Sequence, residues 1–201
     1  MIVANNDLPR SIRTLSDPDS HARETAAAEI FARGCELARP IVEQWSADEE
    51  LASSFLRGAK GVPEQTVGVA VEPAHFERIR KAYGFPPLAD VPPDQDALEF
   101  EIDYPSGVRL DILTTRDPAG SGAIAGFLRK FGEGIQQIEI LVASVDTSAQ
   151  ILQARFGIQP VYRATRAGAN ATRVNFFLVP SPAGGKVLIE LVEAKAPSRG
   201  L

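Results

Sequence analysis

Histidine and cysteine are nearly absent from this sequence, which has two histidines, His21 and His75, and one cysteine, Cys35. Two histidines leave little imidazole for metal ligation or acid–base chemistry. One cysteine cannot form a disulfide within the chain and fits a reducing, cytoplasmic location. The sequence also lacks an apolar run of about 18 residues, a basic block and the start of a signal peptide, so we expect neither a membrane nor a nucleic-acid partner.

The composition is that of a globular protein, because 44% of the 201 residues are hydrophobic and 23% are charged, with a net charge of −5. Residues 1–60 are expected to be a helical segment. In it Gly34 closes one helix, Pro40 bends or starts a second, and a third begins after Ser46 with Glu49 in a capping box. These helices resemble a single HEAT-type unit. Since one such unit is too small to hold its own core, it must pack on the rest of the chain or on a partner subunit, and a homodimer is one expectation.

From residue 66 onward, short strands alternate with helices. The first set is a strand at 66–71, a helix opened by Pro73, and a hairpin formed by LEFEIDY and VRLDILTT. The order then repeats as a strand at 135–142, a helix at 147–157, and strands at 160–166, 172–180 and 186–193. The sequence therefore predicts an α+β fold in which two tandem βαβββ modules form a cupped mixed sheet after the helical hairpin. The predicted domain covers residues 65–193, with modules at 65–116 and 135–193 and a linker at 117–134.

Alternation along the strands places polar side chains on one surface of the predicted sheet. A three-residue hairpin loop would pair Tyr104 with Val108, and so set Asp103 opposite Arg109, Glu101 opposite Asp111 and Glu99 opposite Leu113. By the same rule Gln137 and Glu139 share a face, and Glu190 lies opposite an apolar face. This surface is either a solvated outer face or a site.

The duplicated unit resembles the vicinal oxygen chelate superfamily, and within it the methylmalonyl-CoA epimerases. Three segments carry the resemblance: TVGVAV, GSGAIAGFLRKFGEGIQQIEILV and FFLVPSPAGGKVLIELVE. It covers about residues 65–193 and does not include residues 1–60. The resemblance implies a metal site in a cup, held by two histidines and two carboxylate or carboxamide residues, one from each of four strands.

By position, the four implied metal ligands fall on Thr66, Asp111, Gln137 and Glu190. Thr66 and Gln137 therefore stand where the resemblance implies histidines, and the two acidic ligands are kept as Asp111 and Glu190. A set of oxygen ligands of this kind could hold Mg²⁺, Mn²⁺ or Ca²⁺, and it disfavours zinc, nickel and iron. The alternative is that the protein binds no metal. Glu139 could complete such a site or act as a base. His75 and His21 are expected to be ordinary surface or capping residues.

Three functions follow from these patterns. The first is a glyoxalase-like isomerase or lyase that abstracts a proton next to a carbonyl group of a small molecule, with Glu190 or Glu139 as the base. In that enzyme the predicted substrate-binding residues are Thr66, Arg109, Gln137, Asn175 and Phe177. The second is a metal-free protein that binds a small molecule for resistance or sequestration. The third is an interaction protein in which the helical hairpin is the functional part.

Overall fold

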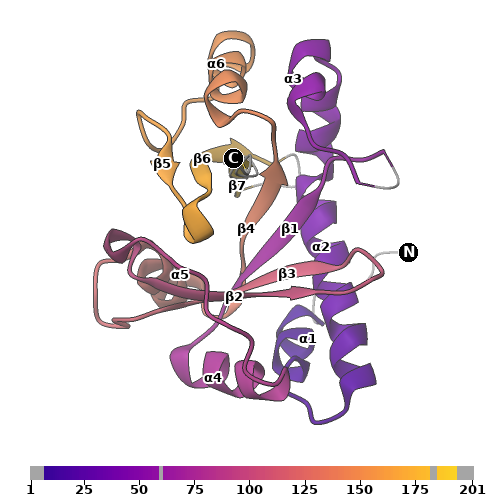
Figure 1. Ribbon diagram of the computed structural model, residues 1–201, viewed down its shortest axis with the longest axis vertical. Coiled ribbons are helices and arrows are strands. Elements are labelled where there is room, and N and C mark those ends of the chain that lie inside the picture. The colour runs from indigo at the N-terminus through magenta and orange to yellow at the C-terminus, as the bar shows by residue number, and fades with distance from the viewer. Residues whose placement is uncertain (1–6, 59–60, 182–184, 194–201) are drawn as a thin grey trace, which may run out of the picture. The chain divides into compact units, whose positions relative to one another are not determined.

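A computed structural model describes residues 7–58, 61–181 and 185–193 of the chain. Three helices come first, namely α1 (Leu8–Thr14), α2 (Ser20–Ser46) and α3 (Glu49–Ser54). Figure 1 shows α2 as one continuous helix. None of the described helices is long and apolar enough to cross a membrane.

The expected helix end at Gly34 is wrong, because α2 runs through both Gly34 and Pro40. A glycine inside a helix costs about 1 kcal/mol relative to alanine. Burial of Ile30 and Ala38 on either side of Gly34 offsets this cost, since neither side chain is exposed. Pro40 removes one helical hydrogen bond and its ring crowds the carbonyl group four residues earlier, yet the helix continues past it.

The third helix begins later than the capping box predicts. Asp48, rather than Ser46, is its N-cap, and the Asp48 carboxylate accepts the Leu51 N–H at 3.0 Å. This bond satisfies one of the free N–H groups at the start of α3. The likeness of these helices to a HEAT-type unit stays a prediction.

Contacts between residues divide the chain into two compact units. Unit 1 holds the described residues up to Glu36 together with Thr66–Gln137, and unit 2 holds Leu37–Gln65 with the described residues from Ile138 onward. Helix α2 therefore contributes its first part to unit 1 and its last part to unit 2.

Unit 1 contains a mixed sheet covered by helices. Its strands β1 (Gln65–Ala70), β2 (Ala97–Asp103) and β3 (Arg109–Thr115) lie in the order β2-β3-β1, with β1 parallel and β2 antiparallel to β3. Helices α4 (Pro73–Ala82) and α5 (Ala123–Phe131) pack on β3, and a 3-10 turn, η1 (Pro93–Gln95), precedes β2. The rings of Phe76 and Phe100 meet edge to face at 5.0 Å in the core.

Unit 2 repeats this arrangement. Its strands are β4 (Gly134–Leu141, whose first four residues belong to unit 1), β5 (Arg166–Ala167), β6 (Arg173–Pro180) and β7 (Lys186–Glu193), in the order β4-β7-β6-β5. β4 is parallel to β7, whereas the pairs β6–β7 and β5–β6 are antiparallel. Helix α6 (Val145–Phe156) packs on β6 and β7, and a 3-10 turn, η2 (Ala169–Ala171), precedes β6. The α+β class and the two modules of mixed sheet are confirmed.

The strand expected at 160–166 is mostly irregular. Pro160 pairs with Phe177, and Arg166 pairs with Val174, so the five residues between these pairs on the outer segment lie opposite only two on β6. The extra residues bulge away from the ladder, because an edge segment has no second neighbour to hold it flat. Only β5, with two residues, is left as regular strand.

Candidate functional site

The polar face of unit 1 has the register that the hairpin predicts. Tyr104 donates its N–H to the Val108 carbonyl oxygen at 3.0 Å, and Gly107 closes the loop at a φ of 83°. The opposed pairs are confirmed as Asp103 with Arg109, Glu101 with Asp111 and Glu99 with Leu113. Residues opposed in a ladder share a face, so the hairpin gathers these charged groups on one side of the sheet.

This face is not a simple solvated surface. Asp111 is 5% exposed and Gln137 is 7% exposed, although Glu101 and Asp103 at the edge are in solvent. Buried polar side chains of this kind carry a desolvation cost that a plain outer face would avoid. The face therefore has an exposed acidic rim beside a buried polar interior.

Gly68 makes room for Gln137 on this face. Gly68 lies beside Asp111 in the β1–β3 ladder, and a Cβ atom at Gly68 would come within 2.5 Å of the Gln137 Cγ atom. Thr66 precedes Gly68 by two residues and so shares its face. Three of the four places implied by the family resemblance, Thr66, Asp111 and Gln137, therefore lie on one face of unit 1.

Glu99 is the ionisable group that the sequence reasoning missed as a candidate base. Burial raises the pKa of its carboxyl group, the negative charge of Glu101 raises it further, and together they bring it to about 7 from 4.5. The spacing of Glu99 and Glu101, two apart on a strand, was the available signal, since it puts two like charges on one face. A carboxyl group that titrates near neutrality is suited to acid–base catalysis.

The polar face of unit 2 carries two neighbouring carboxylates. Glu139 on β4 is the register partner of Glu190 on β7, and Glu190 is 7% exposed. On the other side of Glu190, Phe176 of β6 is its opposed residue. This row places two acids next to an aromatic ring on one face of unit 2.

The expectation that Asn175 and Phe177 join this polar face is wrong. Asn175 is opposed to Leu191 and Phe177 to Ile189, so both point to the other face, which α6 covers. Phe177 is fully buried there. Alternation within β7 predicts the face of Glu190 from the sequence alone. The faces of Asn175 and Phe177 also depend on how β6 pairs with β7, and the sequence analysis did not derive that pairing.

Asn175 instead holds the outer segment against β6. Its side chain donates to the Tyr162 carbonyl oxygen at 3.0 Å and accepts the Tyr162 N–H at 3.4 Å, and Val161 donates its N–H to the Phe176 carbonyl oxygen at 2.7 Å. These bonds replace the ladder that the bulge interrupts. The ring of Tyr162 consequently meets the ring of Phe176 edge to face at 5.9 Å.

Of the two roles expected for His75, surface or capping residue, the surface role is wrong, because His75 is 3% exposed and contacts Glu133. Its Nδ1 atom lies 2.9 Å from each carboxylate oxygen of Glu133, and Glu133 also accepts the Glu72 N–H at 3.0 Å. Burial would raise the pKa of Glu133, but the hydrogen bonds from His75 and the Glu72 N–H outweigh it and lower the pKa. This pair ties the start of α4 to the Gly-Glu-Gly segment that leads into β4.

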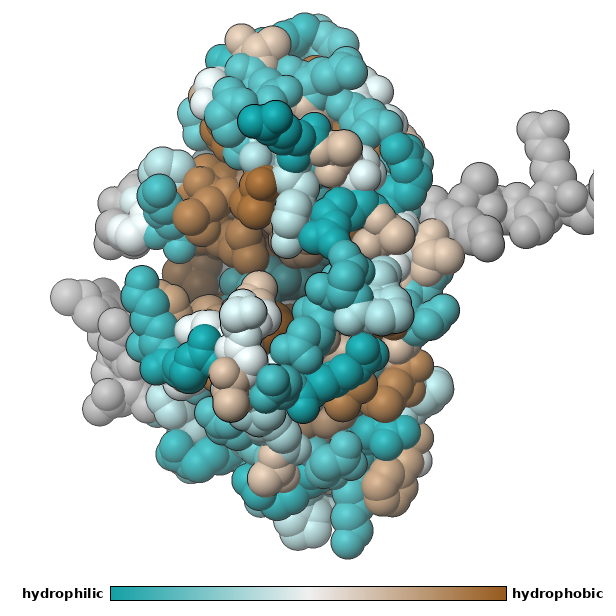
Figure 2. Space-filling model, turned by 90° about the vertical axis from the view of Figure 1, so that its left-hand side faces the viewer, coloured by the Kyte–Doolittle hydropathy of each residue, from teal (hydrophilic) through white to brown (hydrophobic). Residues whose placement is uncertain are grey.

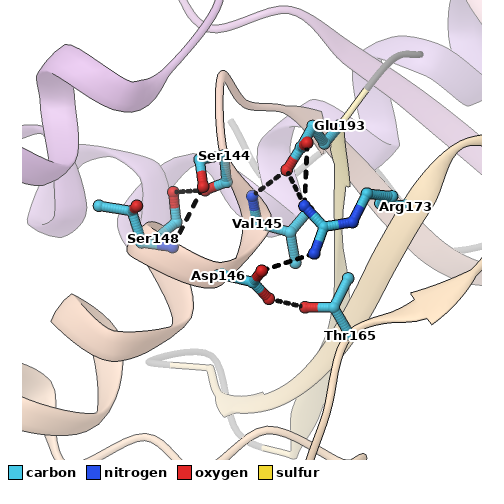
Figure 3. A network of polar contacts seen from close by, with 8 residues as sticks. Ser144, Val145, Asp146, Ser148, Thr165, Arg173 and Glu193 are labelled. Atoms are coloured by element: carbon cyan, nitrogen blue, oxygen red, sulfur yellow. Dashed lines mark hydrogen bonds and ion pairs between the residues drawn. The ribbon is translucent and has the colours of Figure 1, made fainter. Parts of the chain in front are cut away.

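A second polar network holds α6 to the sheet of unit 2. Arg173 binds Glu193 at 3.0 Å and Asp146 at 2.5 Å, Thr165 donates to Asp146, and Glu193 accepts the Val145 N–H at 2.8 Å (Figure 3). Because Arg173 is already paired with two carboxylates, this cluster is a structural connection between α6, β6 and β7.

The donor set does not fit the nitrogen-ligated metal that the family resemblance implies. The four places hold a hydroxyl, a carboxamide and two carboxylates, with no imidazole among them. Of the three implied ligand positions that lie in unit 1, only Asp111 is a carboxylate. In the described part of the chain, no group of three or more His, Cys, Asp or Glu side chains is arranged to hold a metal.

No family model matches this sequence, and no curated protein matches it. The fold, in contrast, matches solved structures of methylmalonyl-CoA epimerases. The enzyme from Mycobacterium tuberculosis is 32% identical, with a TM-score of 0.52, over 65% of this chain and 87% of that enzyme. A variant of the Streptomyces coelicolor enzyme in complex with 2-nitronate-propionyl-CoA is 26% identical, with a TM-score of 0.51, over 67% and 98%.

A third solved structure, a methylmalonyl-CoA epimerase in complex with methylmalonyl-CoA and NH4+, is also 26% identical, with a TM-score of 0.51. It covers 67% of this chain and 95% of its own. About a third of this chain therefore lies outside the part that these structures match.

Proposed function

This chain belongs to the vicinal oxygen chelate superfamily and resembles its methylmalonyl-CoA epimerases, and from that premise we propose that it is an isomerase acting on an acyl thioester. The proposed reaction removes the proton from the carbon next to the thioester carbonyl group and returns it. Solved relatives that hold CoA esters support this substrate class. The proposed ligand is thus a small molecule.

The observation that carries the proposal is the carboxyl group of Glu99. Its pKa of about 7 leaves a large fraction ionised at neutral pH, while the basicity of the carboxylate is higher than that of an ordinary glutamate. Its register partner on β3 is the apolar side chain of Leu113, which is 2% exposed. Burial of the carboxyl group disfavours its charged form and so raises its pKa.

Two polar residues on the same face of unit 1 as Glu99 are proposed to stabilise the enolate that proton removal creates. The carboxamide of Gln137 has two N–H donors, and Arg109 on the same face carries a positive charge. Donors fixed near a developing negative charge contribute several kcal/mol to catalysis, about 3 kcal/mol for one hydrogen bond in favourable cases. In this proposal Glu99 takes the proton, Gln137 and Arg109 polarise the carbonyl oxygen, and no step depends on a metal ion.

Glu139 and Glu190 of unit 2 are also proposed as acid–base groups, as the sequence analysis suggests. They are register partners within unit 2, so one of them could take the proton from the carbon and the other return it. A hard cation such as Mg²⁺, Mn²⁺ or Ca²⁺ stays a prediction of the family resemblance, and no step of the proposed reaction depends on it.

The test is exchange of the proton next to the carbonyl group in D2O, followed by ¹H NMR on a panel of acyl-CoA thioesters that includes methylmalonyl-CoA. We expect the wild-type protein to exchange at least one of them, with or without a chelator. Glu99→Gln should slow exchange by about 10²–10⁴-fold, the usual contribution of a general base. Glu77→Gln is the control and should keep activity, because Glu77 is an exposed carboxylate on α4 of the same unit and does not act on Glu99.

The two alternatives give different results in this test. A protein that binds thioesters without exchanging any of them would be a binding protein, and the proposal would be wrong. Exchange that a chelator abolishes would show that a metal is essential, contrary to the donor set. Equal exchange by wild type and Glu99→Gln would exclude Glu99 as the base.

A further inference from the structure

Gly68 lies in the interior of β1, on the polar face of unit 1. We propose that Gly68 is a positioning residue for the isomerase reaction. The space beside its Cα atom fixes where the carboxamide of Gln137 lies, and the carboxamide in turn meets the enolate oxygen of the substrate. The inference rests on the proposed function, because it adds a residue to that reaction.

The backbone does not explain a glycine at this position. The β1–β3 ladder runs without interruption from Val67 to Ala70, so Gly68 is not part of a bulge. Its φ angle lies outside the left-handed region that favours glycine, in contrast to that of Gly107 in the hairpin loop. Because a glycine in the interior of a strand weakens the strand, the reason for this one lies in the space beside it.

The side chain of Gln137 occupies that space. A Cβ atom at Gly68 would lie 2.5 Å from the Cγ atom of Gln137 and 3.3 Å from its Cδ atom. Carbon atoms in favourable contact are about 3.5–4.0 Å apart, so a methyl group at Gly68 and the present conformation of Gln137 exclude each other. Since Cγ is in the middle of the side chain, Gln137 would have to move its carboxamide to admit that methyl group.

Leu113 restricts the movement of Gln137. Its Cδ1 atom lies 3.2 Å from the same Cβ position at Gly68. Hydrophilic side chains cover most of the surface in view in Figure 2, where solvent lets them move. Gln137 and Leu113, in contrast, are 7% and 2% exposed, so packing holds their conformations.

The same contact brings Gln137 toward the proposed base. Leu113 is the register partner of Glu99, and it meets the stem of Gln137 at Gly68. Glu99, Leu113, Gly68 and Gln137 all belong to unit 1. The arrangement that Gly68 permits is therefore part of the face that carries Glu99.

A fixed carboxamide matters because the carbonyl oxygen of the substrate becomes negative only as the proton leaves. The N–H donors of Gln137 stabilise that charge best when they already lie where it develops. A misplacement of about 1 Å can lower a rate by about 10²-fold. Gly68 thus acts on the reaction through Gln137 and does not itself touch the substrate.

The test is a double-mutant cycle of Gly68→Ala and Gln137→Ala, measured by proton exchange in D2O with the acyl-CoA panel. Gln137→Ala should lower kcat by about 10²–10³-fold, the usual loss for one donor to an oxyanion. Gly68→Ala should lower kcat by at least about 10-fold and leave KM nearly unchanged, because the donor acts in the transition state. The double variant should be no slower than Gln137→Ala alone, since its Gln137 carboxamide is already gone.

Gly126→Ala is the matched control. Gly126 lies in α5 of the same unit, and a Cβ atom there would meet no atom of a neighbouring element within 4 Å, so this variant should keep kcat and KM. A kcat of Gly68→Ala equal to that of wild type, or losses that add in the double variant, would overturn the inference. If Gly68→Ala does not fold, the double variant should fold, because the obstructing Cγ atom is removed; failure of both to fold would also overturn it.

A measurement without substrate separates this inference from the proposed function. The side-chain N–H signals of Gln137, assigned by their loss in Gln137→Ala, should shift in the ¹H–¹⁵N NMR spectrum of Gly68→Ala and stay in place in that of Gly126→Ala. Shifted signals in a protein that exchanges no thioester would keep Gly68 as the residue that places Gln137 and remove the isomerase. Signals that Gly68→Ala leaves in place would overturn the inference, and exchange by the wild-type protein would then still support the isomerase.

Discussion

Glu99 and its neighbours show how a few side chains set the chemistry of a sheet face. Burial removes water from the Glu99 carboxyl group and Glu101 adds a like charge, so the neutral form of Glu99 is favoured up to about pH 7. Strand parity and the odd hairpin loop predict which residues face each other, because both depend on local geometry. The pKa of Glu99 could not be predicted in the same way, since it depends on burial by distant parts of the chain.

The same carboxyl group makes the stability of the protein depend on pH. The pKa of Glu99 is about 7 in the folded state and 4.5 when unperturbed, so between these values the folded protein binds more protons and loses stability as pH rises. We predict that Glu99→Gln and wild type have similar free energies of unfolding near pH 4. Above about pH 7 the variant should be more stable by roughly 1–3 kcal/mol, a figure reduced for partial exposure.

Urea denaturation at several pH values measures this difference. Glu101→Gln serves as the control, because it removes only the like charge and should recover part of the stability. A gap between Glu99→Gln and wild type that is constant from pH 4 to pH 8 would contradict the account.

Whole helices and strands were predicted well where a periodic pattern is long, and poorly at their ends. The hairpin of β2 and β3 was predicted pair by pair, because alternation and loop length leave one register. The helix end at Gly34 was wrong because glycine only lowers helix stability, and packing of the long helix overrides that preference. The segment before β5 bulges because it lies at the edge of the sheet and because the Asn175 side chain bonds its backbone at Tyr162. Neither feature can be read from a strand pattern.

The link between α4 and β4 also escaped the sequence reasoning, because His75 and Glu133 are 58 residues apart. Glu133→Gln should lower the free energy of unfolding at neutral pH by about 1–3 kcal/mol, the range for a hydrogen bond to a charged group. Because the pKa of Glu133 is lowered on folding, this contribution is present above its usual pKa and is lost as pH falls through the lowered value. Denaturation at about pH 7 and pH 3 measures the change.

His75→Ala is the second variant, and it should cost as much as Glu133→Gln at neutral pH. If both variants are as stable as wild type at neutral pH, then the pair does not tie α4 to the start of β4.

At the scale of the whole molecule, two modules of the same type carry different polar faces. Unit 1 supplies a carboxyl group whose pKa is raised to about 7, and unit 2 supplies two neighbouring carboxyl groups next to the ring of Phe176. The fold of the superfamily could be predicted because its strand order repeats in the sequence. The missing histidines were visible there too, whereas a metal, a homodimer and the division between residues 1–60 and 65–193 stay predictions.

The most direct test of the central claim is the pKa of Glu99 itself, which needs no substrate. A ¹³C NMR titration of the side-chain carboxyl carbons, with the Glu99 signal assigned by its loss in Glu99→Gln, measures this value in the full chain. The account predicts a midpoint of about 7 for this carboxyl group. A midpoint near 4.5, the ordinary value for glutamate, would contradict it.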